Sequence, residues 1–204
     1  MAKEQKDNAN QKRYVAEFAF NEFRRKGIKA VKMDDLAASL GISKRTIYEL
    51  FEDKEELLIE GLKIDAENSQ QAIANIVNEE GTTFFEAFLK WLSVSIGQIR
   101  GINCNFLIDL AHYRKVQMFF SQQKAERNKH AKEFMERGVA EGMFRDDIDF
   151  ELLIRLYGML KEALVNSNIF NEINFNDYFK SFQLVNLRGI CTEKGLEILN
   201  KYEF

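Results

Sequence analysis

The sequence contains no proline and only two cysteines in 204 residues. Because proline interrupts helices, its absence permits long helices, and the alternation typical of strands is scarce. Cys104 and Cys191 are too few for a disulfide framework, so we expect two buried or half-buried thiols, with a redox switch as the alternative. His112 and His130 have no carboxylate pattern typical of a metal site. The sequence therefore predicts an all-α protein with no metal centre and no cofactor.

Long hydrophobic runs are also missing. No apolar segment approaches the ~20 residues that cross a bilayer. Residues 1–13 are polar and charged and contain no apolar stretch typical of a secretory signal, so we expect them to form a flexible basic arm. The hydrophobic fraction of 46% is nevertheless ordinary for a globular chain. We expect a cytoplasmic protein with no membrane partner.

Charge is unevenly distributed along the chain. Residues 1–48 carry 11 Lys and Arg against 6 Asp and Glu, a net charge of +5, whereas the net charge of the whole chain is -3. The remaining residues therefore carry -8. A basic segment attached to an acidic body is typical of a module that faces an anionic partner. A solvated helix face with a chance bias is the alternative.

Hydrophobic spacing predicts a series of helices joined by short breaks. Gly27 and Gly41 are expected to end helices, and Ser43, Asp53 and Asp149 to cap the starts of others. Glu56 is expected to complete a capping pair with Asp53. The predicted helices span residues 10–26, 33–40, 44–51, 53–78, 84–99, 105–113, 115–141, 149–167, 174 or 176 to 188, and 193–202.

The segment 33–51 has the pattern of a helix-turn-helix, with two short helices joined by a tight turn at Gly41. Its predicted small core consists of Leu36, Ala37, Leu40, Ile42, Ile47 and Phe51. The second helix begins Ser43-Lys44-Arg45-Thr46, and a helix N-terminus with two cations favours phosphate. An αα-hairpin with a cationic end is the alternative interpretation.

A longer pattern extends this segment on both sides. The residues are Ala19-x-x-x-Phe23-x-x-x-Gly27-Ile28, Met33-x-x-Leu36-Ala37-x-x-x-Gly41-Ile42-Ser43 and Ile47-Tyr48-x-x-Phe51-x-x-Lys54-x-x-Leu57. Together they closely resemble the TetR (TetR/AcrR) family of bacterial regulators, over roughly Ala16 to Gly61. The rest of the chain resembles this family only in size and helical layout.

The resemblance implies roles for individual residues. Tyr48 and Lys54 match positions that grip phosphate, and Lys44, Arg45 and Thr46 match positions that read bases in the major groove. The full set of predicted DNA-binding residues is Lys32, Met33, Ser43, Lys44, Arg45, Thr46, Tyr48 and Lys54. Two positions depart from the family pattern: Lys32 stands where Thr or Ser often caps a helix, and Leu50 replaces a frequent His or Tyr.

The family layout implies two domains, a basic arm with the helix-turn-helix at residues 1–54 and a helical effector-binding and dimerisation domain at 55–204. Two C-terminal helices, around 152–164 and 175–185, are apolar on more than one face and must bury both. They are expected to pair in a homodimer, with a thick monomer core as the alternative. The residues expected to line a pocket for a small apolar effector are Phe88, Trp91, Phe106 and Tyr157, with plain core packing as the alternative.

Taken together, the sequence predicts a ligand-responsive repressor that binds a palindromic double-stranded operator as a homodimer. A regulator without a small-molecule effector, controlled by a protein partner or by its abundance, is the alternative, as is an activator. Ser/His/Asp and Cys/His constellations, Gly-rich phosphate loops and paired carboxylates are missing from the sequence, so we expect no enzyme.

Overall fold

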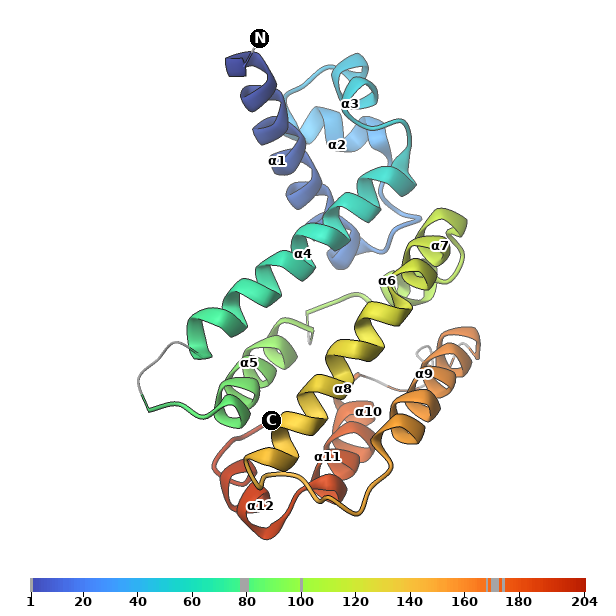
Figure 1. Ribbon diagram of the computed structural model, residues 1–204. Helices are drawn as coiled ribbons and strands as arrows, with labels where there is room; N and C mark the ends of the chain where they lie inside the picture. Colours follow the sequence, from blue (N-terminus) through green and yellow to red (C-terminus); the bar gives the residue numbers. More distant parts are fainter. Residues whose placement is uncertain (1, 78–80, 100, 168, 170–172, 174) are drawn as a thin grey trace. The chain divides into compact units, whose positions relative to one another are not determined.

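The structure is a computed structural model that describes residues 2–77, 81–99, 101–167, 169, 173 and 175–204. In these residues helices are joined by turns, and the one β-type pairing is an isolated bridge between Phe144 and Cys191. The all-α class and the N-terminal helix-turn-helix followed by a helical region are therefore confirmed (Figure 1). None of the described helices is both long and apolar enough to cross a membrane.

The helices in chain order are α1 (Ala2–Lys26), α2 (Met33–Leu40), α3 (Lys44–Leu50), α4 (Lys54–Val77), α5 (Phe84–Ile99), α6 (Cys104–Leu110), α7 (Arg114–Gln122), α8 (Lys124–Ala140), α9 (Phe150–Asn166), α10 (Phe175–Tyr178), a π-helical turn (Phe179–Gln183), α11 (Leu184–Ile190) and α12 (Glu193–Leu199). They form two compact units, one of residues 1–70 with 102–121 and the other of residues 71–101 with 122–204. The expected division at residue 54 into a DNA-binding domain and an effector-binding domain stays a prediction.

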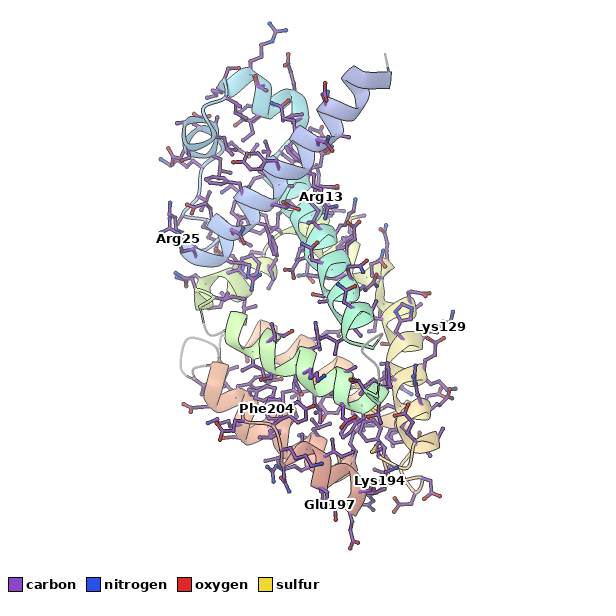
Figure 2. The ribbon with its side chains drawn as sticks, turned by 90° about the vertical axis from the view of Figure 1, so that its left-hand side faces the viewer. Arg13, Arg25, Lys129, Lys194, Glu197 and Phe204 are labelled. Carbon is purple, nitrogen blue, oxygen red and sulfur yellow. The ribbon has the colours of Figure 1, made fainter. Side chains whose placement is uncertain are left out.

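The first unit is built around the crossing of α1 and α4. Phe20 of α1 lies against Gly61 of α4, where an added Cβ would be 2.7 Å from the Phe20 Cβ, so the glycine permits the close approach. Arg13, labelled in Figure 2, extends from α1 to the Glu67 carboxylate of α4 at 2.9 Å. The buried residues of this core include Val15, Ala19, Phe20, Phe23, Ile28, Leu36, Ile47, Phe51, Leu57, Leu58, Phe106 and Val116.

The flexible arm expected at residues 1–13 is wrong, because α1 begins at Ala2. Once the packed part of a helix is formed, each further residue adds one hydrogen bond, and no proline or glycine interrupts this stretch. Lys12 also holds this stretch in place, because its Nζ lies 3.0 Å from the Glu56 carboxylate of α4 and 4.9 Å from the centre of the Phe51 ring.

The segment α6–α7 belongs by packing to the first unit. Phe106 of α6 and Val116 of α7 are buried in its core, and the Phe106 ring meets Phe20 edge to face at 5.6 Å. The α6 start is tied to the α1 end, since the backbone N–H of Asn103 donates to the Arg24 carbonyl at 2.8 Å. The sequence pattern did not predict this attachment, because the contacting residues are some 80 positions apart.

The second unit has an aromatic core. Phe144 meets Phe85 at 5.3 Å and Phe134 at 5.4 Å between ring centres, and it lies directly over Gly138, where a Cβ would collide with its ring. At the end of the chain, Phe204 packs 6.0 Å from Phe179 (Figure 2). The other buried residues of this core are Leu89, Met143, Cys191 and Leu199.

Two predicted helices of the C-terminal region differ from the structure. The helix expected over 115–141 is two helices, because Gln123 interrupts it between α7 and α8. The last large helix starts at Phe175 and contains a π-helical turn, Phe179–Gln183, that a 3.6-residue pattern does not foresee. Asn78 and Asn174, named as expected helix limits, lie outside the described residues.

Candidate nucleic-acid interface

The α2–turn–α3 segment has the local chemistry that its sequence predicts. Gly41 adopts a left-handed conformation with φ +66°, and the N–H of Ile42 donates to the Ala37 carbonyl at 3.0 Å, which ends α2. Ser43 then caps α3, because its Oγ accepts from the backbone N–H of Thr46 at 3.0 Å. The turn thus leads directly into a capped second helix.

One face of α3 is buried and the other is open. Ile47 and Leu50 pack into the core beside Phe51, which follows the helix. Leu50, which stands where the family pattern often has His or Tyr, is therefore a packing residue. The exposed side chains of α3 are Lys44, Arg45, Tyr48 and Glu49, with Thr46 half-buried. The α3 residues among the expected DNA contacts thus share the face of the helix that the core does not cover.

The two cations at the start of α3 are each paired with a carboxylate. Lys44 Nζ lies 2.9 Å from the Asp34 carboxylate of α2, and Arg45 Nε lies 2.7 Å from that of Glu49. The hydrogen bonds to these carboxylates raise the pKa of both Lys44 and Arg45, so both are cations at neutral pH. Ion pairs this exposed are weak, and a phosphate can compete for them.

Lys32 and Met33, at the start of α2, lie in different environments. Lys32 occupies the N-cap position without a side-chain cap, as expected for lysine, and its side chain is exposed. In the residues that the structure describes it has no ion-pair partner, which leaves its amine free to meet a phosphate. Met33 is buried in the core, so only its backbone is available to a partner.

Lys54, at the start of α4, is half-buried and makes a contact within the first unit. Its Nζ donates to the Ile28 carbonyl at 3.0 Å, and desolvation by burial lowers its pKa against the opposing charge of Asp109. Asp53 caps α4 as expected, since it accepts from the Glu56 N–H at 2.8 Å. The Glu56 carboxylate accepts from the N–H of Glu52 at 2.7 Å, one residue before the Asp53 N–H that a reciprocal capping pair would use. The Lys54 amine thus links α4 to the loop after α1.

The structure also reveals site residues that sequence reasoning did not name. Glu49 is four positions after Arg45, the spacing at which side chains meet on one helix face, and this signal was available in the sequence. Asp34, in the first turn of α2, accepts from the Lys44 amine. No local pattern predicts their pairing, because it depends on how α2 and α3 pack.

The four residues expected to line an effector pocket do not form one cluster. Phe88 and Trp91 lie 6.1 Å apart on α5, and Phe88 also contacts Phe134 at 4.5 Å. Tyr157 of α9 meets Phe182 at 6.0 Å, and burial raises its pKa. Phe106 packs in the core of the first unit. Phe88 and Trp91 are thus neighbours in the second unit, whereas Phe106 belongs to the first.

Comparison with known proteins identifies the N-terminal segment. Residues 17–60 match the model of the bacterial regulatory proteins of the tetR family. Among curated proteins, none matches this chain.

Solved structures with the same fold extend over most of the chain. A TetR-family transcriptional regulator from Cytophaga hutchinsonii is 18% identical, with a TM-score of 0.63, covering 92% of this chain and 98% of its own. A TetR transcriptional regulator from Chloroflexus aurantiacus is 21% identical, with a TM-score of 0.57 over 82% and 88%. A protein from Saccharomonospora viridis, solved in complex with choline, is 19% identical, with a TM-score of 0.57 over 91% and 100%. At these identities the likeness shows the fold.

Proposed function

Since the chain belongs, by the domain at residues 17–60, to the TetR family of bacterial transcriptional regulators, we propose that it is a ligand-responsive repressor that binds a palindromic operator as a homodimer. Regulators of this family bind DNA and are not enzymes. The observation that carries the proposal is the open face of α3, where Lys44 and Arg45 stand at a capped helix N-terminus over a buried core. A regulator of chromosomal genes works in the cytoplasm, which is the location we propose.

The DNA contacts that we propose divide into two groups. Lys44, Arg45 and Thr46 at the α3 start read base edges in the major groove, where side chains of a recognition helix reach the bases. Lys32, Ser43, Tyr48 and Lys54, together with the Met33 backbone, contact phosphate and fix the position of the helix. Contacts of the first group carry sequence preference, and those of the second add affinity for any sequence.

A titration of fluorescent duplexes from the region upstream of the gene tests this division. We expect sequence-selective binding that weakens as salt rises. Arg45→Ala should lower the preference for the operator over unrelated DNA, whereas Lys54→Ala should weaken binding to all sequences alike. Because Lys54 also holds the Ile28 carbonyl, Lys32→Ala is the cleaner phosphate variant, since that side chain is exposed. Binding that is equally strong to every sequence would sink the proposal.

We further propose that the homodimer forms through α9 and the last large helix, which consists of α10, the π-helical turn and α11. Leu152, Leu156 and Met159 are 51%, 51% and 60% exposed and recur on one face of α9, and Val185 of α11 is 58% exposed. Such a stripe would be covered by a symmetry mate in a four-helix interface. Two α3 helices can then meet successive major grooves about 34–36 Å apart.

Sedimentation of the Leu156→Asp variant tests the interface. We expect a monomer that binds a half-site weakly and without preference for the palindrome. Val94→Asp is the matched control, because Val94 is 60% exposed on α5, outside the proposed interface, and this variant should stay a dimer. A Leu156→Asp protein that remains dimeric would contradict the interface.

An effector would act by binding more tightly to a conformation with a different α3 spacing, with α4 carrying the movement. For its pocket we propose Phe88, Trp91 and Tyr157 of the second unit, while the expectation for Phe106, in the core of the first unit, stays a separate prediction. The aromatic pair Phe88 and Trp91 suits an apolar or cationic small molecule. Choline, bound by the Saccharomonospora viridis protein, is a reasonable first probe. A ligand near Trp91, the single tryptophan, should change the fluorescence of that residue and raise the melting temperature of the protein.

A panel of metabolites that leaves the melting temperature unchanged would favour the alternatives, a regulator controlled by a protein partner or by its abundance. A reporter gene distinguishes repression from activation.

A further inference from the structure

The exposed face of α3 carries one carboxylate, that of Glu49. Its side chain is 57% exposed and contributes nothing to the core beneath α3, which Ile47 and Leu50 supply. Its polar contact among the described residues is the ion pair with Arg45, whose side chain is 87% exposed. An ion pair of this exposure adds little to stability. The fold therefore does not require a glutamate at this position.

A carboxylate on a helix that enters the major groove is unfavourable for general DNA binding. Phosphates repel it, and it offsets part of the attraction that Lys44 and Arg45 provide. The groove does, however, present amino groups as well as acceptors. Cytosine offers its N4 amino group, which a carboxylate accepts well, whereas the N7 and O6 of guanine and the O4 of thymine are acceptors that repel it. The N6 amino group of adenine is a donor too, but the N7 acceptor beside it repels a carboxylate, so a glutamate here favours cytosine over the other three bases.

Arg45 supplies the other half of the contact. Only its Nε donates to Glu49, at 2.7 Å, so its two terminal NH2 groups keep the donors that grip the O6 and N7 of a guanine. The two residues are one helical turn apart on the same face, and so can reach neighbouring base pairs. Resting on the proposed function, we propose that Glu49 determines operator specificity by selecting a cytosine next to the guanine read by Arg45.

Selection of binding sites from a randomised duplex library tests this assignment. The wild-type protein should enrich a motif in which a cytosine stands beside a guanine in each half-site. Glu49→Gln should exchange the cytosine preference for adenine at that position, because a glutamine amide pairs with the N6 and N7 of adenine. We expect its preference for cytosine there to fall by about tenfold or more, the order of one base contact. Its affinity for unrelated DNA should rise.

Glu52→Gln is the matched charge control. The side chain of Glu52 is 83% exposed and follows α3 in sequence. This variant therefore removes the same charge nearby without changing the exposed face of α3. It should bind all sequences more tightly and select the wild-type motif. Circular dichroism should show both variants folded, since both positions are exposed.

The outcomes separate this inference from the function on which it rests. A wild-type motif that Glu49→Gln leaves unchanged would overturn the inference and leave the DNA-binding function standing. A variant that loses only the guanine preference would also overturn it, because Glu49 would then merely orient Arg45. A wild-type protein that enriches no motif would overturn both the function and the inference.

Discussion

The carboxylate of Asp109 accepts a hydrogen bond from the backbone N–H of Lys29 at 2.9 Å, across 80 residues of sequence. Asp109 is 4% exposed, and it also pairs with the Lys29 amine at 3.2 Å. It thereby fastens α6 to the loop between α1 and α2, the loop whose Ile28 carbonyl Lys54 holds from the other side. The helix-turn-helix is therefore supported by a residue far outside its own sequence.

Removing this carboxylate should destabilise the first unit. Asp109→Ala leaves a half-buried backbone donor without its partner, and we expect a loss of about 2–3 kcal/mol in the free energy of unfolding, as for hydrogen bonds to charged groups. Urea unfolding followed by far-ultraviolet circular dichroism measures it. Lys29→Met is the matched control, because it keeps the backbone N–H and loses only an amine that is 62% exposed. Equal losses in the two variants would contradict the role of the backbone bond.

The cap at Ser43 gives a second prediction. Ser43→Ala removes the acceptor for the Thr46 N–H and should cost about 1 kcal/mol, with weaker DNA binding because the α3 start frays. Ser43→Thr should restore most of both. Ser39→Ala provides the comparison, since the Ser39 hydroxyl only donates to the Asp35 carbonyl within α2 and alanine favours helix. Equal melting temperatures for the two alanine variants would contradict the role of the cap.

In the second unit, Gly138 is required by packing. An added Cβ would collide with the Phe144 ring, so Gly138→Ala should destabilise by about 1–3 kcal/mol through overpacking. Gly97→Ala in α5 should be neutral or stabilising by up to about 1 kcal/mol, because an added Cβ there would meet no described atom outside the adjoining helix within 4 Å. Unfolding monitored by the fluorescence of Trp91, which lies in the same unit, compares them. A Gly138→Ala protein as stable as the wild type would be inconsistent with the packing described.

These cases show how far sequence alone reaches. Local features were predictable: Gly41 ends α2, Ser43 caps α3 and Asp149 caps α9, where it accepts from the Leu152 N–H at 2.9 Å. Such features depend on residues within a few positions of each other. The attachment of Asp109 to Lys29 depends on the tertiary fold, so no spacing foretells it.

The candidate site divides in the same way. The open face of α3 follows from helical periodicity, which places Ile47 inward and Lys44 and Arg45 outward. The environments of Met33 and Lys54 did not follow from the resemblance. Met33 is buried and Lys54 contacts the Ile28 carbonyl, and both facts depend on how the helices pack together. The roles of both in DNA binding stay predictions.

The thiol of Cys191 should be inert in the folded protein. Burial raises its pKa to about 11, from an ordinary value of 9.0, so the reactive thiolate is scarce at pH 8. In a Cys104→Ser background, a chromogenic disulfide reagent should react slowly with native protein and rapidly in denaturant. Prompt stoichiometric reaction with the native protein would refute the prediction. The side chain of Cys104 lies outside the described residues.

The same shift has a consequence for stability. The raised pKa favours the folded state fully below about pH 9, where the thiol is protonated in both states. As pH rises from about 9 to about 11, the unfolded chain loses the proton first, so this contribution is lost. Cys191→Ala should therefore flatten the fall of unfolding free energy between these pH values.

Methylation protection of guanine N7 by dimethyl sulfate tests most directly whether α3 enters the major groove, because N7 lies on the floor of that groove. On an operator selected from random DNA, the wild-type protein should protect guanines in two patches about one helical turn apart, 34–36 Å between centres. Arg45→Ala should restore reactivity at one guanine in each patch. Guanines that react equally with and without bound protein would contradict the account.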